Sequence, residues 1–317
     1  MSARGTGSGR PCTRRFESLS NGHVPRNFPA EAPEKRSTLM AGRTVESTSV
    51  STLLLPVAVS LATAATLLVN YLANGLPING QTTGDVTRRF EVYFVPAGYV
   101  FSIWSVIYLG LIAYSVYLSL SLARRRSDSG AARAIAPWYL VTAAANCSWL
   151  FAWHHNRFPL SMLLMLVLLG TLIVIYRLQA ARPPVSTVER WTVHIPFRVY
   201  LGWISVATIA NATITLDDAG WSGFGLSEPT WGVIMVLVAA ALGLTMTFLH
   251  RDIAYALVLV WALIGIAVRL HETTAILVVA LAGAAALALS VLVIALRDRT
   301  DQRRNLASSA PSSSNKA

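Results

Sequence analysis

The sequence has little charge and almost no cysteine, and both shortages limit what the protein can be. Only 13% of the 317 residues are charged and 54% are hydrophobic, whereas a soluble globular protein has roughly 25% charged residues. So large an apolar content excludes a chain that is disordered from end to end. The apolar residues form long unbroken runs, which argues against a single water-soluble core. Only two cysteines occur, Cys12 and Cys147, so neither a disulfide framework nor a cysteine-rich zinc site can be built.

Motifs of common enzymes are also missing. There is no Walker phosphate loop, no dinucleotide-binding glycine pattern and no nucleophile elbow. His271-Glu272 resembles the start of a zinc-protease motif, but Ala275 stands where the second histidine would be. His154 and His155 are adjacent, and neighbours on a helix do not face each other, so we expect interfacial polar residues rather than metal or haem ligands. The sequence therefore predicts no enzyme, no catalytic residue and no metal site.

Eight apolar segments follow one another between residues 52 and 296. Most have the roughly 20 residues that an α-helix needs to cross the hydrocarbon core of a bilayer, and the seventh is the shortest. Backbone in lipid must satisfy its own hydrogen bonds, which favours helices. The sequence therefore predicts an all-α polytopic membrane helical bundle of about eight transmembrane helices. The expected spans are residues 52–72, 97–122, 135–154, 160–176, 196–216, 231–249, 253–268 and 274–296.

The basic residues are distributed unevenly around these spans. If the N-terminus lies in the cytoplasm, 21 of the 26 Lys and Arg residues fall in cytoplasmic segments and four in outer loops, the asymmetry that orients membrane proteins. We therefore expect both termini in the cytoplasm of a bacterial cell, at the inner membrane, with residues 1–51 and 297–317 as disordered tails. Because orientation explains the net charge of +11, we expect membrane lipid and no nucleic acid among the partners.

The spans themselves carry few charges. No unpaired Asp or Glu lies near the middle of any of them, although an ion-coupled carrier usually keeps such groups at mid-membrane. The sequence therefore favours a protein that binds a ligand or facilitates its movement over a proton- or sodium-driven pump. A secondary transporter of a small solute is the alternative.

Aromatic and amide residues recur at helical spacing in the second, third and fifth spans. Spacings of i, i+3 and i+7 place each set on one helix face, and the expected topology brings part of each set to the outer half of the bundle: Phe101 and Trp104, Asn146 and Trp149, and Asn211 with Thr208. An apolar pocket with a few polar groups suits a flat hydrophobic ligand, whereas ordinary packing and interfacial anchoring are the structural alternative. The sets are Phe101, Trp104 and Tyr108; Asn146, Trp149 and Trp153; and Tyr200, Trp203, Ala207 and Asn211, with Thr208 adjacent.

These segments resemble motifs of the TspO/MBR family, the tryptophan-rich sensory proteins or translocator proteins, which are related to the peripheral benzodiazepine receptor. Residues 94–117 read FVPAGYVFSIWSVIYLGLIAYSVY and resemble the family's second helix, with a Pro before the helix and a Trp followed four residues later by Tyr. The third span, from Asn146, resembles an Asn-x-x-Trp-x-x-Phe-Phe pattern. The fifth, from Pro196 to Asn211, resembles a Pro-(x)n-Trp-x-x-x-Ala-Thr-x-x-Asn pattern.

The resemblance covers residues 52–220 and implies a five-helix TspO-like core. That family binds porphyrins and other flat apolar ligands in a pocket at the end capped by the loop between the first two helices. Residues 221–296 would then be three additional transmembrane helices, which pack on the flank of the core or replace a homodimer contact. By motif, the residues that line or support the pocket are Trp104, Tyr108, Asn146, Trp149, Trp203, Ala207, Thr208 and Asn211, and the helical stripe adds Phe101.

The implied role is non-enzymatic. We expect a sensory, receptor-like or facilitated-transport protein that binds an apolar small molecule, with a porphyrin or haem as a ligand rather than a resident cofactor. A homodimer is one possible assembly. Enzymatic breakdown of tetrapyrroles or modification of lipids is the remaining alternative, against which stands the lack of a paired acid and base.

Overall fold

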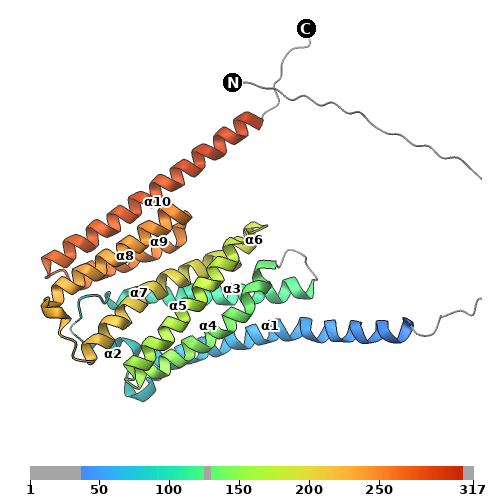
Figure 1. The fold of residues 1–317 in the computed structure, drawn as a ribbon, viewed down its shortest axis with the longest axis horizontal. Coiled ribbons are helices and arrows are strands. Elements are labelled where there is room, and N and C mark those ends of the chain that lie inside the picture. The colour runs from blue at the N-terminus through green and yellow to red at the C-terminus, as the bar shows by residue number, and fades with distance from the viewer. Residues whose placement is uncertain (1–36, 91, 125–129, 310–317) are drawn as a thin grey trace, which may run out of the picture. The chain divides into compact units, whose positions relative to one another are not determined.

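The computed structural model describes residues 37–90, 92–124 and 130–309. Within these ranges the secondary structure is entirely helical (Figure 1). Short helical turns interrupt the connections at η1 (Ile78–Gly80), η2 (Gly98–Ser102), η3 (Arg190–His194) and η4 (Gly223–Gly225). The α-helices are α1 (Ser37–Gly75), α2 (Thr83–Arg88), α3 (Ile103–Ala123), α4 (Gly130–His154), α5 (Phe158–Ala180), α6 (Thr187–Glu189), α7 (Ile195–Asp218), α8 (Glu228–His250), α9 (Ile253–Arg269) and α10 (Thr274–Ser309).

Seven of the eight expected spans lie within one long helix each, and the span 97–122 is divided between η2 and α3. The predicted all-α membrane bundle is confirmed. Among the described residues, six helices are long and apolar enough to cross a bilayer. The two other expected spans are α4, which carries buried polar residues such as Asn146 and Thr142, and α9, which has 17 residues. The protein is an integral membrane protein.

Helix α1 and helix α10 extend further than the sequence analysis expected. Residues 37–51 and 297–309, which were assigned to tails, continue these helices, because no proline interrupts either stretch. Asp298, in the polar extension of α10, forms an ion pair at 2.8 Å with Arg251 in the α8–α9 turn. The rest of the expected tails, residues 1–36 and 310–317, lies outside the described residues.

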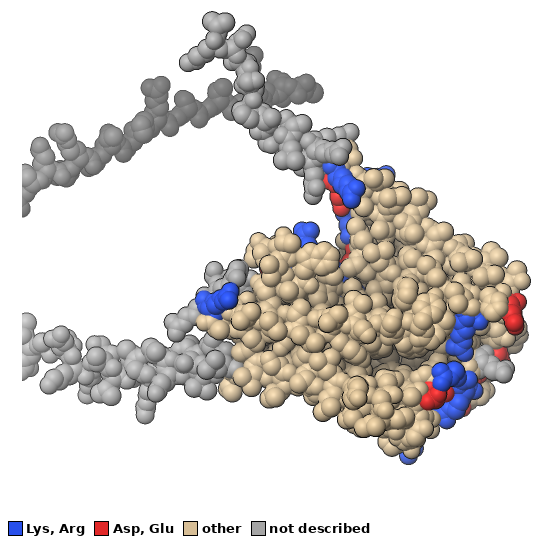
Figure 2. All heavy atoms as spheres, turned by 180° about the vertical axis from the view of Figure 1, so that it is seen from behind, with Lys and Arg blue, Asp and Glu red and all other residues tan. Residues whose placement is uncertain are grey.

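Successive long helices run antiparallel, so the connections gather at two ends (Figure 1). The end that holds α2, here called the α2 end, also holds the turns at residues 155–157, 219–227 and 270–273. Large hydrophobic side chains such as Leu61, Leu109 and Leu163 are more than half exposed along the helices. Figure 2 shows a broad uncharged surface with acidic and basic side chains towards its edges, as a lipid-facing band requires.

The last three helices dock on the earlier ones through α9. The backbone N–H of Ala97 donates to the Gly265 carbonyl at 3.0 Å, and the Trp261 indole donates to the Val100 carbonyl at 3.1 Å. A Cβ atom at Gly265 would overlap the Val100 side chain, so only glycine permits this approach. Helix α9 therefore fixes the segment that leads into α3.

Candidate ligand-binding site

A cavity of about 1240 Å³ opens at the α2 end, between α1, α2, η2, α3, α4 and the end of α9. We call it the main cavity. Its walls are largely apolar and aromatic, and α1 adds Asn70 and Asn74. An apolar concavity with a few polar groups is the usual form of a small-molecule site. The aromatic residues from the three helical sets that line it are Phe101, Trp104, Tyr108 and Trp149.

A smaller void of about 50 Å³ shares part of these walls. Phe101, Trp104 and Trp149 line both spaces, and the void adds residues from α7. It thus brings the α7 set to the same place as the α3 and α4 sets. The α7 residues that line the void are Trp203, Val206, Ala207, Ala210, Asn211 and Ile214.

The aromatic side chains of the cavity wall pack on one another across helices. Trp104 stacks on Tyr108, one helical turn away, with ring centroids 5.6 Å apart and planes at 23°. From α7, Trp203 meets Trp104 and Phe101 edge-on, at 6.2 and 5.6 Å. Trp149 stacks on Trp153 at 5.5 Å within α4. Each side chain is thereby held in place, which leaves a pre-formed surface for an apolar ligand.

Asn146 lies behind this wall and not in it. Its side chain is fully buried, accepts a hydrogen bond from Asn70 at 2.8 Å and donates one to the Tyr200 hydroxyl at 3.1 Å. It thus joins α4 to α1 and α7. Thr208 lines neither space and donates to the Ile204 carbonyl of its own helix at 2.7 Å. Of the nine expected site residues, the structure brings seven to the cavity walls, and places Asn146 in a supporting role.

Three buried donors at the cavity walls have no hydrogen-bond partner among the described residues. They are the indole nitrogens of Trp149 and Trp203 and the side-chain nitrogen of Asn211. The Asn211 oxygen, in contrast, accepts from Ser161 and Thr215, at 3.1 Å each. An unpaired buried donor costs about 1–3 kcal/mol.

The loop between α1 and α3 covers the cavity and is fastened to the end of α4. Side chains of Asn79 and Gln81 donate to the carbonyl oxygen of His154. The buried His154 ring points its Nε2 towards the Thr83 hydroxyl, at 3.4 Å, and its Nδ1 to the Leu150 carbonyl, at 2.7 Å. His154 therefore anchors the loop, a role that its position in the sequence does not reveal.

Helix α2, inside this loop, is closed at its start by a reciprocal cap. The Thr82 hydroxyl accepts from the Asp85 backbone at 3.2 Å, while the Asp85 carboxylate accepts from the Thr82 hydroxyl and backbone at 2.7 and 2.8 Å. These hydrogen bonds, with Arg88 nearby, hold the pKa of the Asp85 carboxyl below its usual value. The cap fixes the first turn of α2. Arg88, the last residue of this helix, forms an ion pair with Asp85 and lines the main cavity.

Two arginines line the main cavity, Arg88 from α2 and Arg269 from the end of α9. Neither was expected, because the sequence gives no sign that the seventh span ends beside the first loop. Asn70 and Asn74 were also missed, although their i, i+4 spacing on α1 is a signal that could have been read. Together these residues add a basic and amide edge to an aromatic pocket.

Comparison with known proteins gives one finding. A family model described as TSPO-like protein matches residues 56–293. The matched residues run from α1 into α10 and so include α8 and α9. No curated protein and no solved structure gives a significant match.

Proposed function

The chain belongs to the TSPO-like protein family, and from this premise we propose that it binds a planar apolar molecule with acidic edge groups, such as a porphyrin. The ligand occupies the main cavity, and the protein acts as a sensor, a receptor or a facilitator of the ligand's movement. The observation that carries the proposal is the aromatic wall of Trp104, Tyr108 and Trp149 facing a space that Arg88 and Arg269 border.

The apolar wall supports recognition of a flat ring system. Indole and phenol faces offer large rigid surfaces for stacking at low cost in side-chain entropy. Both members of the α3 pair, Trp104 and Tyr108, line the cavity, and Trp149 of the α4 pair lines it as well. A ligand that lies against these rings buries the face that it turns towards them.

The basic edge supports recognition of carboxylates. A guanidinium donates two parallel hydrogen bonds to a carboxylate, which fixes orientation as well as charge. Arg88 and Arg269 come from separate elements of the cavity rim, which suits a ligand with two acidic groups. Among the described residues that line the cavity there is no His, Cys or Met, so the proposal concerns the ring face and the acidic edge of a porphyrin and not ligation of a haem iron.

Binding without catalysis fits the same residues. Proton transfer in an active site needs a positioned acid or base, and the titratable groups on the described cavity wall are two arginines and the phenols of Tyr71 and Tyr108. We therefore propose no reaction of the bound ligand. Incubation of the protein with protoporphyrin IX should leave the porphyrin unchanged in mass in darkness, and in light should change it no faster than in a sample without protein.

The decisive experiment is a titration of the purified full-length protein with protoporphyrin IX in a neutral detergent, followed by the porphyrin absorption band and by tryptophan quenching. We expect saturable binding that weakens at least about tenfold in Trp104→Leu and in Trp149→Leu, since each loses a stacking face. Trp191→Leu is the matched control, because Trp191 is 63% exposed and lines neither space.

Absence of binding by the wild-type protein, or equal affinities of the cavity variants and Trp191→Leu, would refute the proposal. Proteoliposomes separate the two roles. Uptake of porphyrin that follows its own gradient supports facilitated movement, and binding without uptake supports sensing. Uptake that requires a proton or sodium gradient would favour a secondary transporter instead.

A further inference from the structure

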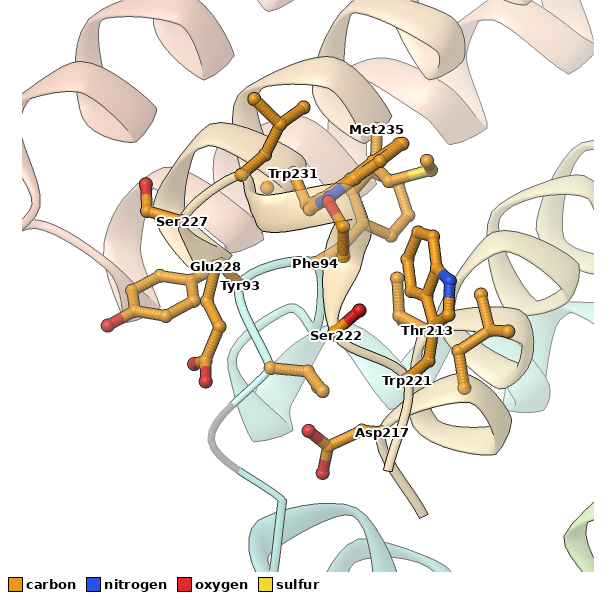
Figure 3. Close-up of a pocket in the computed structure, with 15 residues that line it drawn as sticks. Tyr93, Phe94, Thr213, Asp217, Trp221, Ser222, Ser227, Glu228, Trp231 and Met235 are labelled. Carbon is orange, nitrogen blue, oxygen red and sulfur yellow. The ribbon is translucent and has the colours of Figure 1, made fainter. Parts of the chain in front are cut away.

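A second cavity, of about 480 Å³, lies at the α2 end beside α7 and α8. We call it the α7–α8 cavity. It is formed by the end of α7, the start of α8, the turn between them and residues 92–94 (Figure 3). It shares no lining residue with the main cavity or with the smaller void. Its volume lies in the range of small-molecule sites, about 300–1000 Å³.

The turn at residues 219–227 gives this cavity a defined wall. Gly223, Phe224 and Gly225 all have a positive φ, of 63°, 53° and 77°, a conformation that costs about 1 kcal/mol or more at a residue such as Phe. The Trp231 indole donates to the Gly223 carbonyl at 2.8 Å, and a Cβ at Gly223 would lie 2.9 Å from the same indole. The turn is therefore fitted to the tryptophan, and the cavity is pre-formed.

Aromatic side chains dominate the inside of the cavity. Trp221 and Trp231 face each other with ring centroids 5.0 Å apart, at 53°, and residues 92–94 add Tyr93 and Phe94. Figure 3 shows both indoles among the side chains that line the cavity. Faces of indole and phenol rings carry negative potential and attract cations.

The charges on the cavity wall have one sign. Asp217 at the end of α7 and Glu228 at the start of α8 both line it, and none of its described lining residues is Lys, Arg or His. No ion pair within the described part of the chain neutralises either carboxylate. The main cavity has the opposite sign, since its described charged lining residues are Arg88 and Arg269.

We propose that the α7–α8 cavity binds an organic cation, an ammonium group attached to an apolar or aromatic body. The positive group lies against the indole faces of Trp221 and Trp231 and is attracted by Asp217 and Glu228, and the apolar body fills the remaining space. Quaternary ammonium groups occur both in soluble cations and in the choline headgroup of lipids. The chemistry of the cavity is the same for both sources.

The test is isothermal titration calorimetry of the full-length protein, in a neutral maltoside detergent, with benzyltrimethylammonium as probe. Two control compounds have a similar ring: benzyl alcohol is uncharged, and benzenesulfonate is negatively charged. We expect saturable binding of the cation at one site, and affinity at least about tenfold weaker for the two other compounds. Raising sodium chloride to 0.5 M should weaken cation binding, because exposed charges are screened.

Variants locate the site. The double substitution Asp217→Asn with Glu228→Gln should weaken cation binding at least about tenfold, since it removes two attractive charges. Asp218→Asn is the matched control, because Asp218 is the next residue and does not line the cavity. Trp221→Leu should also weaken binding. Trp104→Leu, which tests the main cavity, should leave cation binding unchanged, so this inference and the porphyrin proposal fail or succeed separately.

Competition by dihexanoyl phosphatidylcholine, below its micelle concentration, would assign the cavity to a lipid headgroup, and lack of competition would assign it to a soluble cation. Equal binding of benzyltrimethylammonium and benzyl alcohol would overturn the proposal. So would a loss of affinity that is the same in the double variant and in Asp218→Asn. Circular dichroism and the porphyrin titration establish that the variants are folded.

Discussion

Replacement of Asn146 by leucine should destabilise the bundle more than its two hydrogen bonds alone would suggest. Asn146 is fully buried and links Asn70 of α1 to Tyr200 of α7. Interhelical hydrogen bonds in membrane proteins contribute about 0.6 kcal/mol each on average. In the variant, Asn70 keeps its bond to the Thr66 carbonyl, at 2.8 Å, but the Tyr200 hydroxyl loses its partner, which costs about 1–3 kcal/mol. The expected loss is therefore roughly 2–4 kcal/mol.

The assay is unfolding of the full-length protein in mixed micelles with increasing dodecyl sulfate, followed by circular dichroism. Ser148→Ala, at an exposed position on the same helix, is the control. The sharper test is the double variant: adding Tyr200→Phe to Asn146→Leu removes the orphaned hydroxyl and should restore about 1 kcal/mol. Further destabilisation by Tyr200→Phe in that background would refute this account of the network.

Three other predictions follow from the same structure. Gly265→Val should force α9 away from the turn before α3 and weaken protoporphyrin IX binding at least about tenfold by titration, since a Cβ there already overlaps its neighbour. Arg269→Gln should weaken binding of protoporphyrin IX about tenfold but leave binding of its dimethyl ester unchanged, because only the free acid can accept from the guanidinium. In a cysteine-free background, a membrane-impermeant maleimide added to whole cells should label Arg157→Cys and not Arg182→Cys. The reverse pattern would invert the proposed orientation, in which both termini are cytoplasmic.

The positions of the helices could be predicted because lipid imposes one simple rule on the sequence. A span must be apolar over about 20 residues and helical throughout, and each of the eight expected segments contains a long helix, six of which are long and apolar enough to cross a bilayer. The aromatic sets were also predictable, because residues at i, i+3 and i+7 must share a face whatever the helix packs against. Trp104 and Trp149 consequently share the wall of the main cavity, and Trp203 lines the smaller void beside it.

What the sequence did not reveal depends on contacts between distant segments. Arg269 borders the main cavity only because Gly265 lets α9 approach the turn before α3. The α7–α8 cavity depends on three consecutive left-handed residues from Gly223 to Gly225, which composition does not specify. The ends of α1 and α10 could not be predicted from polarity, because polar residues mark where a helix leaves the membrane and not where the helix ends. Helix α10 accordingly continues past Leu296.

The last three helices contact the earlier ones at the α2 end and at the opposite end. At the α2 end, α9 supplies Arg269 and Val268 to the main cavity, and α8 supplies Trp231 and Met235 to the α7–α8 cavity. At the other end, the buried Asp252 before α9 lies 3.6 Å from the partly exposed Arg198 of α7, and this ion pair joins α9 to α7 there. Because α9 is fixed to earlier helices at both ends, and because α8 and α9 each line a cavity, the last three helices are part of the cavity walls and do not merely flank the first five.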